Sequence, residues 1–235
     1  MSTLFKFVRD VHRFCVNHLV YPLVLSSLLS CTLFAGRVYL SRSTMYTFLI
    51  WNLFLAWMPY LFSLTATVLY ARRPTAWWLF LGLGSLWLLF LPNAPYIITD
   101  FLHLDTRPPV PTWYDIGMLA MFAWTGCFLG VVSLSQMQAI ARRFFGGPVS
   151  WLFALGAIGL SGLGIYLGRF LYWNSWDLFI QPQSILLNLA VRFAHPIHYR
   201  QTFEVMLLFA TFLLVCYVTF VSIEARKAEN RSKGG

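Results

Sequence analysis

The sequence predicts an all-α protein, a polytopic transmembrane helical bundle of about six spans. The first reason is composition: 59% of the 235 residues are hydrophobic and 11% are charged, whereas soluble domains carry about 25% charged residues. The second is that six apolar stretches approach the ~20 residues needed to cross a bilayer. The third is that Lys and Arg gather at the ends of these stretches. The spans are expected to be helical because a backbone in lipid must satisfy its own hydrogen bonds.

The whole chain, residues 1–235, is expected to form a single integral membrane domain. Basic and apolar residues alternate at helical spacing over residues 1–17, which predicts an amphipathic helix lying on the membrane surface. The transmembrane bundle is expected over residues 18–223, and residues 224–235 are expected to form a charged cytoplasmic tail.

The six expected spans differ in the residues that interrupt them. Asn52 and Pro59 fall inside the second, which predicts a bend. The fifth carries glycines at spacings of three and four, which predict a close contact with another helix. These glycines are Gly156, Gly159, Gly162, Gly164 and Gly168. The spans cover about residues 18–39, 44–70, 76–98, 113–140, 149–173 and 197–223.

Residues 174–196 predict a second interfacial segment before the last span. Pro182 suits the first turn of a helix. The residues after it form an apolar stripe and a polar stripe of Asn188, Arg192 and His195. The pattern leaves open whether this helix is re-entrant or lies on the surface. Pro196 is expected to open the last span.

The basic residues predict the orientation of the chain. With a cytoplasmic N-terminus, eleven of the 17 Lys and Arg lie on the cytoplasmic side and six on the other. Because positive residues favour the cytoplasmic side, both termini are expected there. Most acidic residues and histidines of the bundle then fall at the extracytoplasmic face.

A polar stretch follows the third apolar run, over Leu91–Asp105. Pro92 and Pro95 are expected to end the helix. Asp100 and His103 then share a helix face, where they could hold a divalent metal or form an acid–base pair. Alternatively, Asp100 caps a helix and His103 lies at the lipid headgroups. Two more polar residues of this stretch are Asn93 and Asp105.

Two later segments are expected to face that stretch. Asp115 either stabilises a helix N-terminus or points toward the polar stretch. Arg169 lies inside the end of a span, where contact with lipid would be costly. It is therefore expected to pair with Asp100, Asp115 or Asp177, or to bind a phosphate or carboxylate ligand. Asn174 is expected beside it.

These residues form the candidate site at the extracytoplasmic face. The catalytic candidates are Asp100, His103 and Asp115. The ligand-binding candidates are Asn93, Asp105, Arg169, Asn174 and Asp177. The metal-ligand candidates are Asp100 and His103.

Other classes of protein are not supported. The net charge of +9 lies at span ends, so it predicts membrane orientation and no nucleic-acid partner. The four cysteines form no C-x-x-C pair, so neither a disulfide framework nor a thiolate metal site is indicated. The sequence contains no Walker loop, dinucleotide fingerprint, H-E-x-x-H or G-x-S-x-G motif.

Three blocks of sequence carry a resemblance to a known family. The first is Pro-Asn-Ala-Pro-Tyr-Ile-Ile-Thr-Asp at residues 92–100, followed by His103 and Leu104. The others are Trp-Tyr-Asp at 113–115 and Gly-Arg-Phe at 168–170 with Trp-Asn-Ser-Trp-Asp at 173–177. In this order they resemble the bacterial membrane family labelled domain-of-unknown-function family thirteen sixty-one. The resemblance implies a small multi-pass protein of the bacterial cytoplasmic (inner) membrane and no particular activity.

Three functions remain open. The preferred prediction is a structural or accessory membrane protein, whose polar cluster fixes the register of the helices. The first alternative is a membrane-embedded enzyme, with or without a metal ion, acting on a lipid or lipid-linked substrate. The second is a small-solute transporter, because broken helices around a polar centre are typical of transporter sites. The lipid bilayer is the expected partner, while the cofactor and any membrane-protein partner or homo-oligomer are left open.

Overall fold

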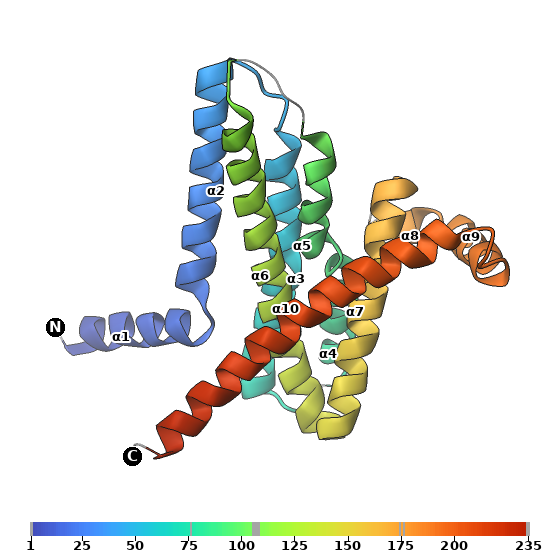
Figure 1. The fold of residues 1–235 in the computed structure, drawn as a ribbon. Helices are drawn as coiled ribbons and strands as arrows, with labels where there is room; N and C mark the ends of the chain where they lie inside the picture. The colour runs from blue at the N-terminus through green and yellow to red at the C-terminus, as the bar shows by residue number, and fades with distance from the viewer. Residues whose placement is uncertain (1, 76, 105–108, 174, 176, 234–235) are drawn as a thin grey trace.

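The computed structural model describes residues 2–75, 77–104, 109–173, 175 and 177–233 (Figure 1). Within these ranges all regular structure is helical, which confirms the predicted all-α class. The elements are α1 (Ser2–Asn17), α2 (Val20–Ser41), α3 (Phe48–Arg72), α4 (Trp77–Phe90), α5 (Asn93–Tyr96), the 3₁₀ helix η1 (Ile97–His103), α6 (Thr112–Phe145), α7 (Gly147–Phe170), α8 (Asp177–Ile180), α9 (Pro182–Ala194) and α10 (Arg200–Lys233).

Within the described ranges, six helical segments are long and apolar enough to cross a membrane, as the sequence predicts. They are α2, α3, a composite segment Trp77–His103, α6, α7 and the first part of α10. In the composite segment the chain leaves α4 at Phe90 and continues through α5 and η1. Helix α4 ends before Pro92, as expected, but Pro95 lies inside α5, so helical turns resume at once.

The long helix α6 is the centre of the bundle. Two thirds of its most apolar window is buried, against 11% for α10. It contacts α2, α3, α5, η1, α7 and α10. Two hydrophobic clusters meet on it, one with α2, α3 and α5 and the other with α4, α7 and α10. Packing of spans against α6 therefore organises the fold.

Glycines allow close approach at three points. Gly126 of α6 faces the backbone carbonyl of Ala94, so a side chain there would collide with α5. Gly162 of α7 faces Met206 in α10, whereas Gly164 faces Pro92. The close contact of α7 with another helix, expected from the glycine spacing, is made by Gly162 against α10, and Gly164 adds a second contact with the turn before α5.

Two helices lie outside the bundle core. Helix α1 runs across the direction of α2 at the end where both termini lie (Figure 1). Helix α9 begins at Pro182, as predicted, and its buried Arg192 lies over the rings of Tyr166 and Tyr199 at 5.8 and 4.6 Å. Helix α10 begins at Arg200. The expectation that Pro196 opens it is wrong, because Pro196 lies in the preceding turn.

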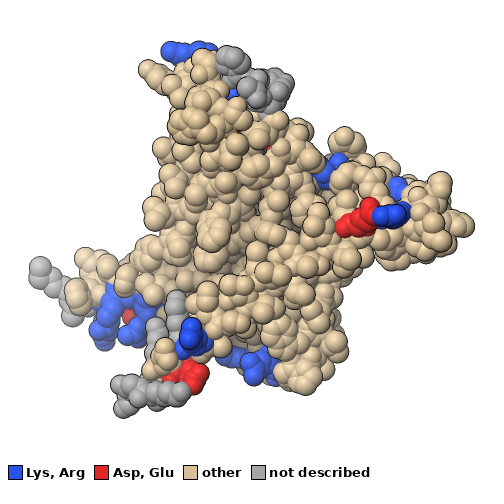
Figure 2. All heavy atoms as spheres, viewed as in Figure 1, with Lys and Arg blue, Asp and Glu red and all other residues tan. Residues whose placement is uncertain are grey.

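Charged side chains gather at the ends of the molecule, with a broad uncharged surface between them (Figure 2). The basic pairs Arg72–Arg73 and Arg142–Arg143 come at the ends of α3 and α6, at the same end of the bundle as the termini. The connection from α2 to α3 lies at the opposite end (Figure 1). We call these the terminal end and the α2–α3 end.

Candidate functional site

A cavity of about 690 Å³ lies between α3, α4, α5, α7 and the segment after α7. We call it the α3–α7 cavity. Its apolar lining includes Trp51, Leu55 and several leucines of α4 and α7. Its polar lining consists of Asn52, Ser85, Asn93, Tyr96, Tyr172 and Ser175. The lining is therefore amphipathic.

Asn93 ties two walls of the cavity together. Its amide nitrogen donates hydrogen bonds to the carbonyl of Phe90 at 3.1 Å and to Ser175 Oγ at 2.9 Å. Ser175 Oγ in turn donates to the carbonyl of Leu89 at 3.2 Å. The predicted ligand-binding residue Asn93 thus lines the cavity and also joins α5 to the segment after α7.

Asp100 lies behind this lining and is 1% exposed. Its Oδ2 accepts a hydrogen bond from Asn52 Nδ2 at 2.8 Å. Its Oδ1 lies 3.6 Å from a terminal nitrogen of Arg169 and has no hydrogen-bond partner among the described residues. Buried carboxylate oxygens are normally hydrogen-bonded. Asp100 Oδ1 is therefore an acceptor with remaining capacity.

Arg169 faces the bundle, in line with the expectation from its position in the sequence. Its side chain is 12% exposed, and Asp100 is the carboxylate it pairs with among the three that the sequence suggested. The guanidinium lies 6.0 Å from the ring centroid of Tyr96, and Gly168 packs on the same ring. Both Tyr96 and Gly168 line the cavity. Arg169 therefore stands beside the cavity as a buried cation.

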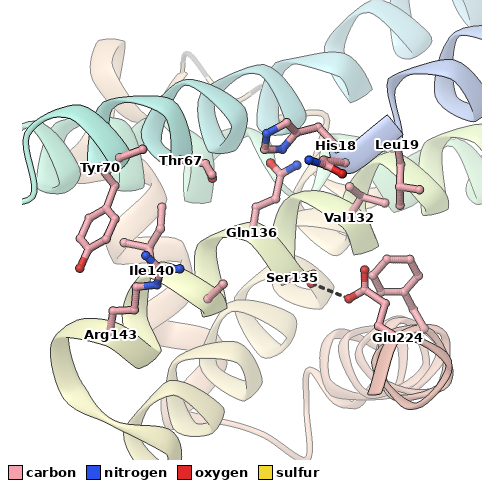
Figure 3. A pocket seen from close by; sticks show the side chains of 14 residues that line it. His18, Leu19, Thr67, Tyr70, Val132, Ser135, Gln136, Ile140, Arg143 and Glu224 are labelled. Carbon is pink, nitrogen blue, oxygen red and sulfur yellow. Dashed lines mark hydrogen bonds between the residues drawn. The ribbon is translucent and has the colours of Figure 1, made fainter. Parts of the chain in front are cut away.

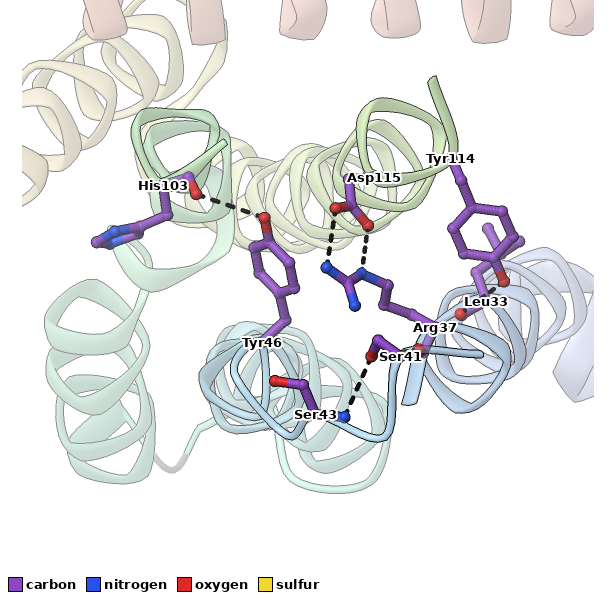
Figure 4. A network of polar contacts seen from close by, with 8 residues as sticks. All are labelled: Leu33, Arg37, Ser41, Ser43, Tyr46, His103, Tyr114 and Asp115. Atoms are coloured by element: carbon purple, nitrogen blue, oxygen red, sulfur yellow. Dashed lines mark hydrogen bonds and ion pairs between the residues drawn. The ribbon is translucent and has the colours of Figure 1, made fainter. Parts of the chain in front are cut away.

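Asp115 belongs to a different network, at the α2–α3 end (Figure 4). Its two oxygens accept hydrogen bonds from Arg37 at 2.7 and 3.2 Å, and both side chains are almost fully buried. The guanidinium lies 5.4 Å from the ring of Tyr46, which donates to the carbonyl of His103 at 3.4 Å. The pair joins α2 to α6. Bidentate arginine–carboxylate geometry of this kind fixes two helices relative to each other.

Asp100 and His103 differ in exposure, although a 3₁₀ helix aligns residues three apart. Asp100 is buried, whereas His103 is exposed and its ring packs against Phe48 at 5.1 Å. Among the described residues, no group of three or more His, Cys, Asp or Glu side chains could hold a metal. Catalysis or metal binding by these two residues stays a prediction.

Three further candidates are Asp177, Asp105 and Asn174. Asp177 is partly buried at the start of α8. Asp105 and Asn174 lie outside the described residues. Tyr172, beside the cavity, has a positive φ of 56°, a conformation that is uncommon for a residue with a side chain.

Arg37 and Asn52 were not predicted from the sequence as members of polar pairs. Arg37 lies one turn before the end of α2, near enough to the helix end to count among the loop charges that set orientation. Asn52 lies in an apolar span, where a polar side chain normally requires a partner. The position of each residue inside an expected span is the signal from which a polar partner could have been predicted.

Comparisons with known proteins place the chain in a family. No curated protein and no solved structure matches it. A family model described as "Protein of unknown function (DUF1361)" matches residues 51–222, well over half of the chain. The match includes the α3–α7 cavity, Asp100, Asp115 and Arg169, while Arg37 precedes it. The expected resemblance is confirmed: the chain belongs to the DUF1361 family.

Proposed function

We propose that this protein is an integral protein of the bacterial inner membrane that binds a lipid or lipid-linked molecule in the α3–α7 cavity. The observation that carries the proposal is the amphipathic lining of that cavity beside the buried Arg169 and Asp100. Ligand sites commonly combine an apolar wall with a few convergent polar groups.

The two kinds of lining residue support an amphiphilic ligand. Asn52 lies one turn from the start of α3, and Asn93 begins α5. Asn52 is therefore near the α2–α3 end, whereas Asn93 follows Pro92, which packs against Gly164 of α7. Leu160 and Leu163 precede Gly164 and lie two to three helical turns before the end of α7. The polar groups suit a headgroup, and the leucines suit the chain attached to it.

The buried pair supports a head that contains phosphate and a hydrogen-bond donor. Arg169 offers a planar guanidinium that suits phosphate oxygens. Asp100 Oδ1 accepts a hydrogen bond from a hydroxyl or ammonium group. Asn52 lines the cavity and donates a hydrogen bond to Asp100 Oδ2 at 2.8 Å, so it links the carboxylate to the lining. A headgroup carrying both kinds of group satisfies both residues.

The placement of charge supports the orientation. Both termini and the basic pairs ending α3 and α6 lie at one end of the bundle. Because basic residues favour the cytoplasmic side, the terminal end is cytoplasmic in this proposal. Asn52, which lines the cavity one turn from the start of α3, is then at the level of the extracytoplasmic leaflet.

The test is lipid retention by the purified protein, measured by native mass spectrometry after extraction from the membrane. Ser85→Phe places a ring in the cavity from α4, whereas Leu86→Phe changes an exposed neighbour outside the lining. We expect Ser85→Phe to lose the bound lipid and Leu86→Phe to retain it. Equal retention by the two variants at wild-type thermal stability would overturn the proposal.

A structural or accessory role is the second candidate, and the Arg37–Asp115 network favours it. This pair is sealed between α2 and α6 and lines no described cavity. A protein with this role alone would lose stability in Ser85→Phe and Asp115→Asn in proportion to their packing defects. It would show no lipid retained by wild type, and that result separates the two candidates.

A further inference from the structure

The face of helix α9 that packs on the bundle carries an arginine. Ile185 and Arg192 are seven residues apart, which places them on one side of a helix, and they are the buried residues of α9. Leu186, Leu187 and Phe193 point elsewhere and are exposed. Helix α9 lies at the edge of the bundle, near the end of α7 and the start of α10 (Figure 1). Exposed apolar side chains on such a helix are typical of the boundary between acyl chains and headgroups.

Arg192 lacks the carboxylate partner that the other inward-facing arginines have. In the pairs Arg37–Asp115 and Arg169–Asp100, a guanidinium nitrogen lies 2.7 and 3.6 Å from a carboxylate oxygen. Within the described ranges, Arg192 forms no ion pair, and its buried Nε has no hydrogen-bond partner. A buried charge without a counter-charge is costly. Arg192 is therefore the buried arginine whose charge the described part of the chain leaves uncompensated.

Two tyrosine rings contact the guanidinium of Arg192 without satisfying its donors. The guanidinium lies 5.8 Å from the ring centroid of Tyr166 in α7 and 4.6 Å from that of Tyr199, just before α10. A cation–π contact attracts the charge but supplies no acceptor oxygen for the N–H groups. The acid nearest in the sequence, Glu204, pairs with Arg200 at 2.5 Å. Arg192 thus keeps N–H donors for an oxyanion.

Burial separates Arg192 from two exposed arginines that also lie over a tyrosine. Arg143 lies 5.4 Å from the ring centroid of Tyr70, beside a cavity of about 270 Å³ at the terminal end (Figure 3). Arg42 lies 5.2 Å from the ring centroid of Tyr39. Both arginines are exposed, so water satisfies their donors. Arg192 is 9% exposed, and through that small exposed part it can meet an anion at the surface of the bundle.

We propose that Arg192 binds a phosphate group at the junction of α7, α9 and α10. The phosphate compensates the buried charge, and its oxygens accept hydrogen bonds from the planar guanidinium. A lipid headgroup supplies phosphate at the level of an interfacial helix, and free inorganic phosphate offers the same oxygens. Arg192, Tyr166 and Tyr199 do not line the α3–α7 cavity, so this site does not depend on lipid binding in that cavity.

The test is a thermal-shift titration of the detergent-purified full chain, which gives an apparent dissociation constant for each probe. The probes are short-chain phosphatidylglycerol, inorganic phosphate and short-chain monoacylglycerol, which lacks phosphate. Arg192→Gln removes the charge, and Arg192→Lys keeps the charge without the planar fork. The matched control is Arg42→Gln, which removes an exposed arginine from a tyrosine ring.

We expect Arg192→Gln to weaken phosphatidylglycerol binding about tenfold, because it removes a charge-assisted hydrogen bond, and Arg42→Gln to leave it unchanged. Arg192→Lys is expected to weaken it about threefold, because a single ammonium replaces the fork. Inorganic phosphate that binds as tightly as phosphatidylglycerol would support the site and identify a soluble ligand. Weaker binding of inorganic phosphate with the same dependence on Arg192 would support a lipid headgroup.

Three results would overturn the proposal. The first is an equal effect of Arg192→Gln and Arg42→Gln on phosphatidylglycerol binding. The second is monoacylglycerol binding that matches phosphatidylglycerol binding in affinity and in sensitivity to Arg192→Gln. The third is an Arg192→Gln protein that unfolds at a lower temperature but keeps wild-type affinity, as a purely structural arginine requires. If Arg192→Gln does not fold, wild-type affinity of Arg192→Lys for phosphatidylglycerol replaces the third result.

Discussion

Two buried arginine–aspartate pairs hold this bundle together, and they differ in how completely they are satisfied. Arg37 and Asp115 form two hydrogen bonds, at 2.7 and 3.2 Å, with both side chains sealed from solvent. Arg169 and Asp100 approach only to 3.6 Å, and one oxygen of Asp100 has no hydrogen bond among the described residues. In the Arg37–Asp115 pair, both carboxylate oxygens accept hydrogen bonds that join α2 to α6. In the Arg169–Asp100 pair, Asp100 Oδ1 can still accept a hydrogen bond beside the cavity, which is the arrangement expected of a binding residue.

The sharpest test of this difference replaces each aspartate by its isosteric amide. Asp115→Asn leaves the guanidinium of Arg37 buried without a charged partner, so we expect it to lower the free energy of unfolding by about 3–5 kcal/mol. Unfolding of the purified protein in mixed detergent micelles measures the loss. Asp10→Asn, an exposed carboxylate of α1, is the control. A loss below about 1 kcal/mol, within the range of a surface pair, would contradict the structural role of Arg37–Asp115.

Asp100→Asn is expected to cost less, about 2 kcal/mol, because the carboxylate makes one hydrogen bond and a long ion pair. The same unfolding measurement applies. This variant is also expected to retain less lipid in native mass spectrometry, whereas Asp115→Asn is not, once the two are compared at temperatures where both are folded. A cost for Asp100→Asn above that of Asp115→Asn would reverse the comparison.

Asn52→Leu removes the hydrogen bond between the Asn52 amide and Asp100 and keeps the Arg169–Asp100 ion pair. It removes the donor to Asp100 Oδ2 and leaves a buried oxygen unsatisfied, so the expected loss in unfolding free energy is about 1–2 kcal/mol. Asn188→Leu, an exposed position of α9, should change it little. Additive effects of Asn52→Leu and Asp100→Asn in a double-mutant cycle would argue against a shared hydrogen bond.

Tyr46→Phe is expected to have the smallest effect, about 0.5 kcal/mol. It removes a long hydrogen bond, at 3.4 Å, to the carbonyl of His103, and it keeps the ring beneath Arg37. Thermal unfolding against Tyr39→Phe, an exposed tyrosine of α2, resolves the difference. A loss as large as that of Asp115→Asn would show that the tyrosine hydroxyl, rather than the ion pair, holds this network.

The fold was largely predictable from the sequence, and the polar pairing was not. A helix must be about 20 residues long to cross the bilayer, so the six apolar stretches could be identified directly. The proline that starts α9 could also be identified from the sequence. Which polar residue meets which depends on the rotation of each span about its axis. Arg37 and Asp115 are 78 positions apart, and no local pattern links them.

The polar stretch after α4 was predictable only in part for the same reason. The prolines indicated a break after α4, but the short helices that come next depend on packing against α6. That packing buries Asp100 and leaves His103 exposed. The spacing of Asp100 and His103 therefore predicts that they share a helix face, but it does not predict which of them is buried.

The contact between Ala94 and Gly126 has a mechanical consequence for the α3–α7 cavity. Because the carbonyl of Ala94 rests directly on the backbone at Gly126, α5 cannot slide along α6 without a collision. The α5 wall of the cavity is therefore fixed in position relative to α6. The opposite wall, α7, touches it through Gly164, where an added methyl group would meet the ring of Pro92 at 2.5 Å. A change in the distance between these two walls then comes from displacement of α7, which the contact of Gly164 with Pro92 limits.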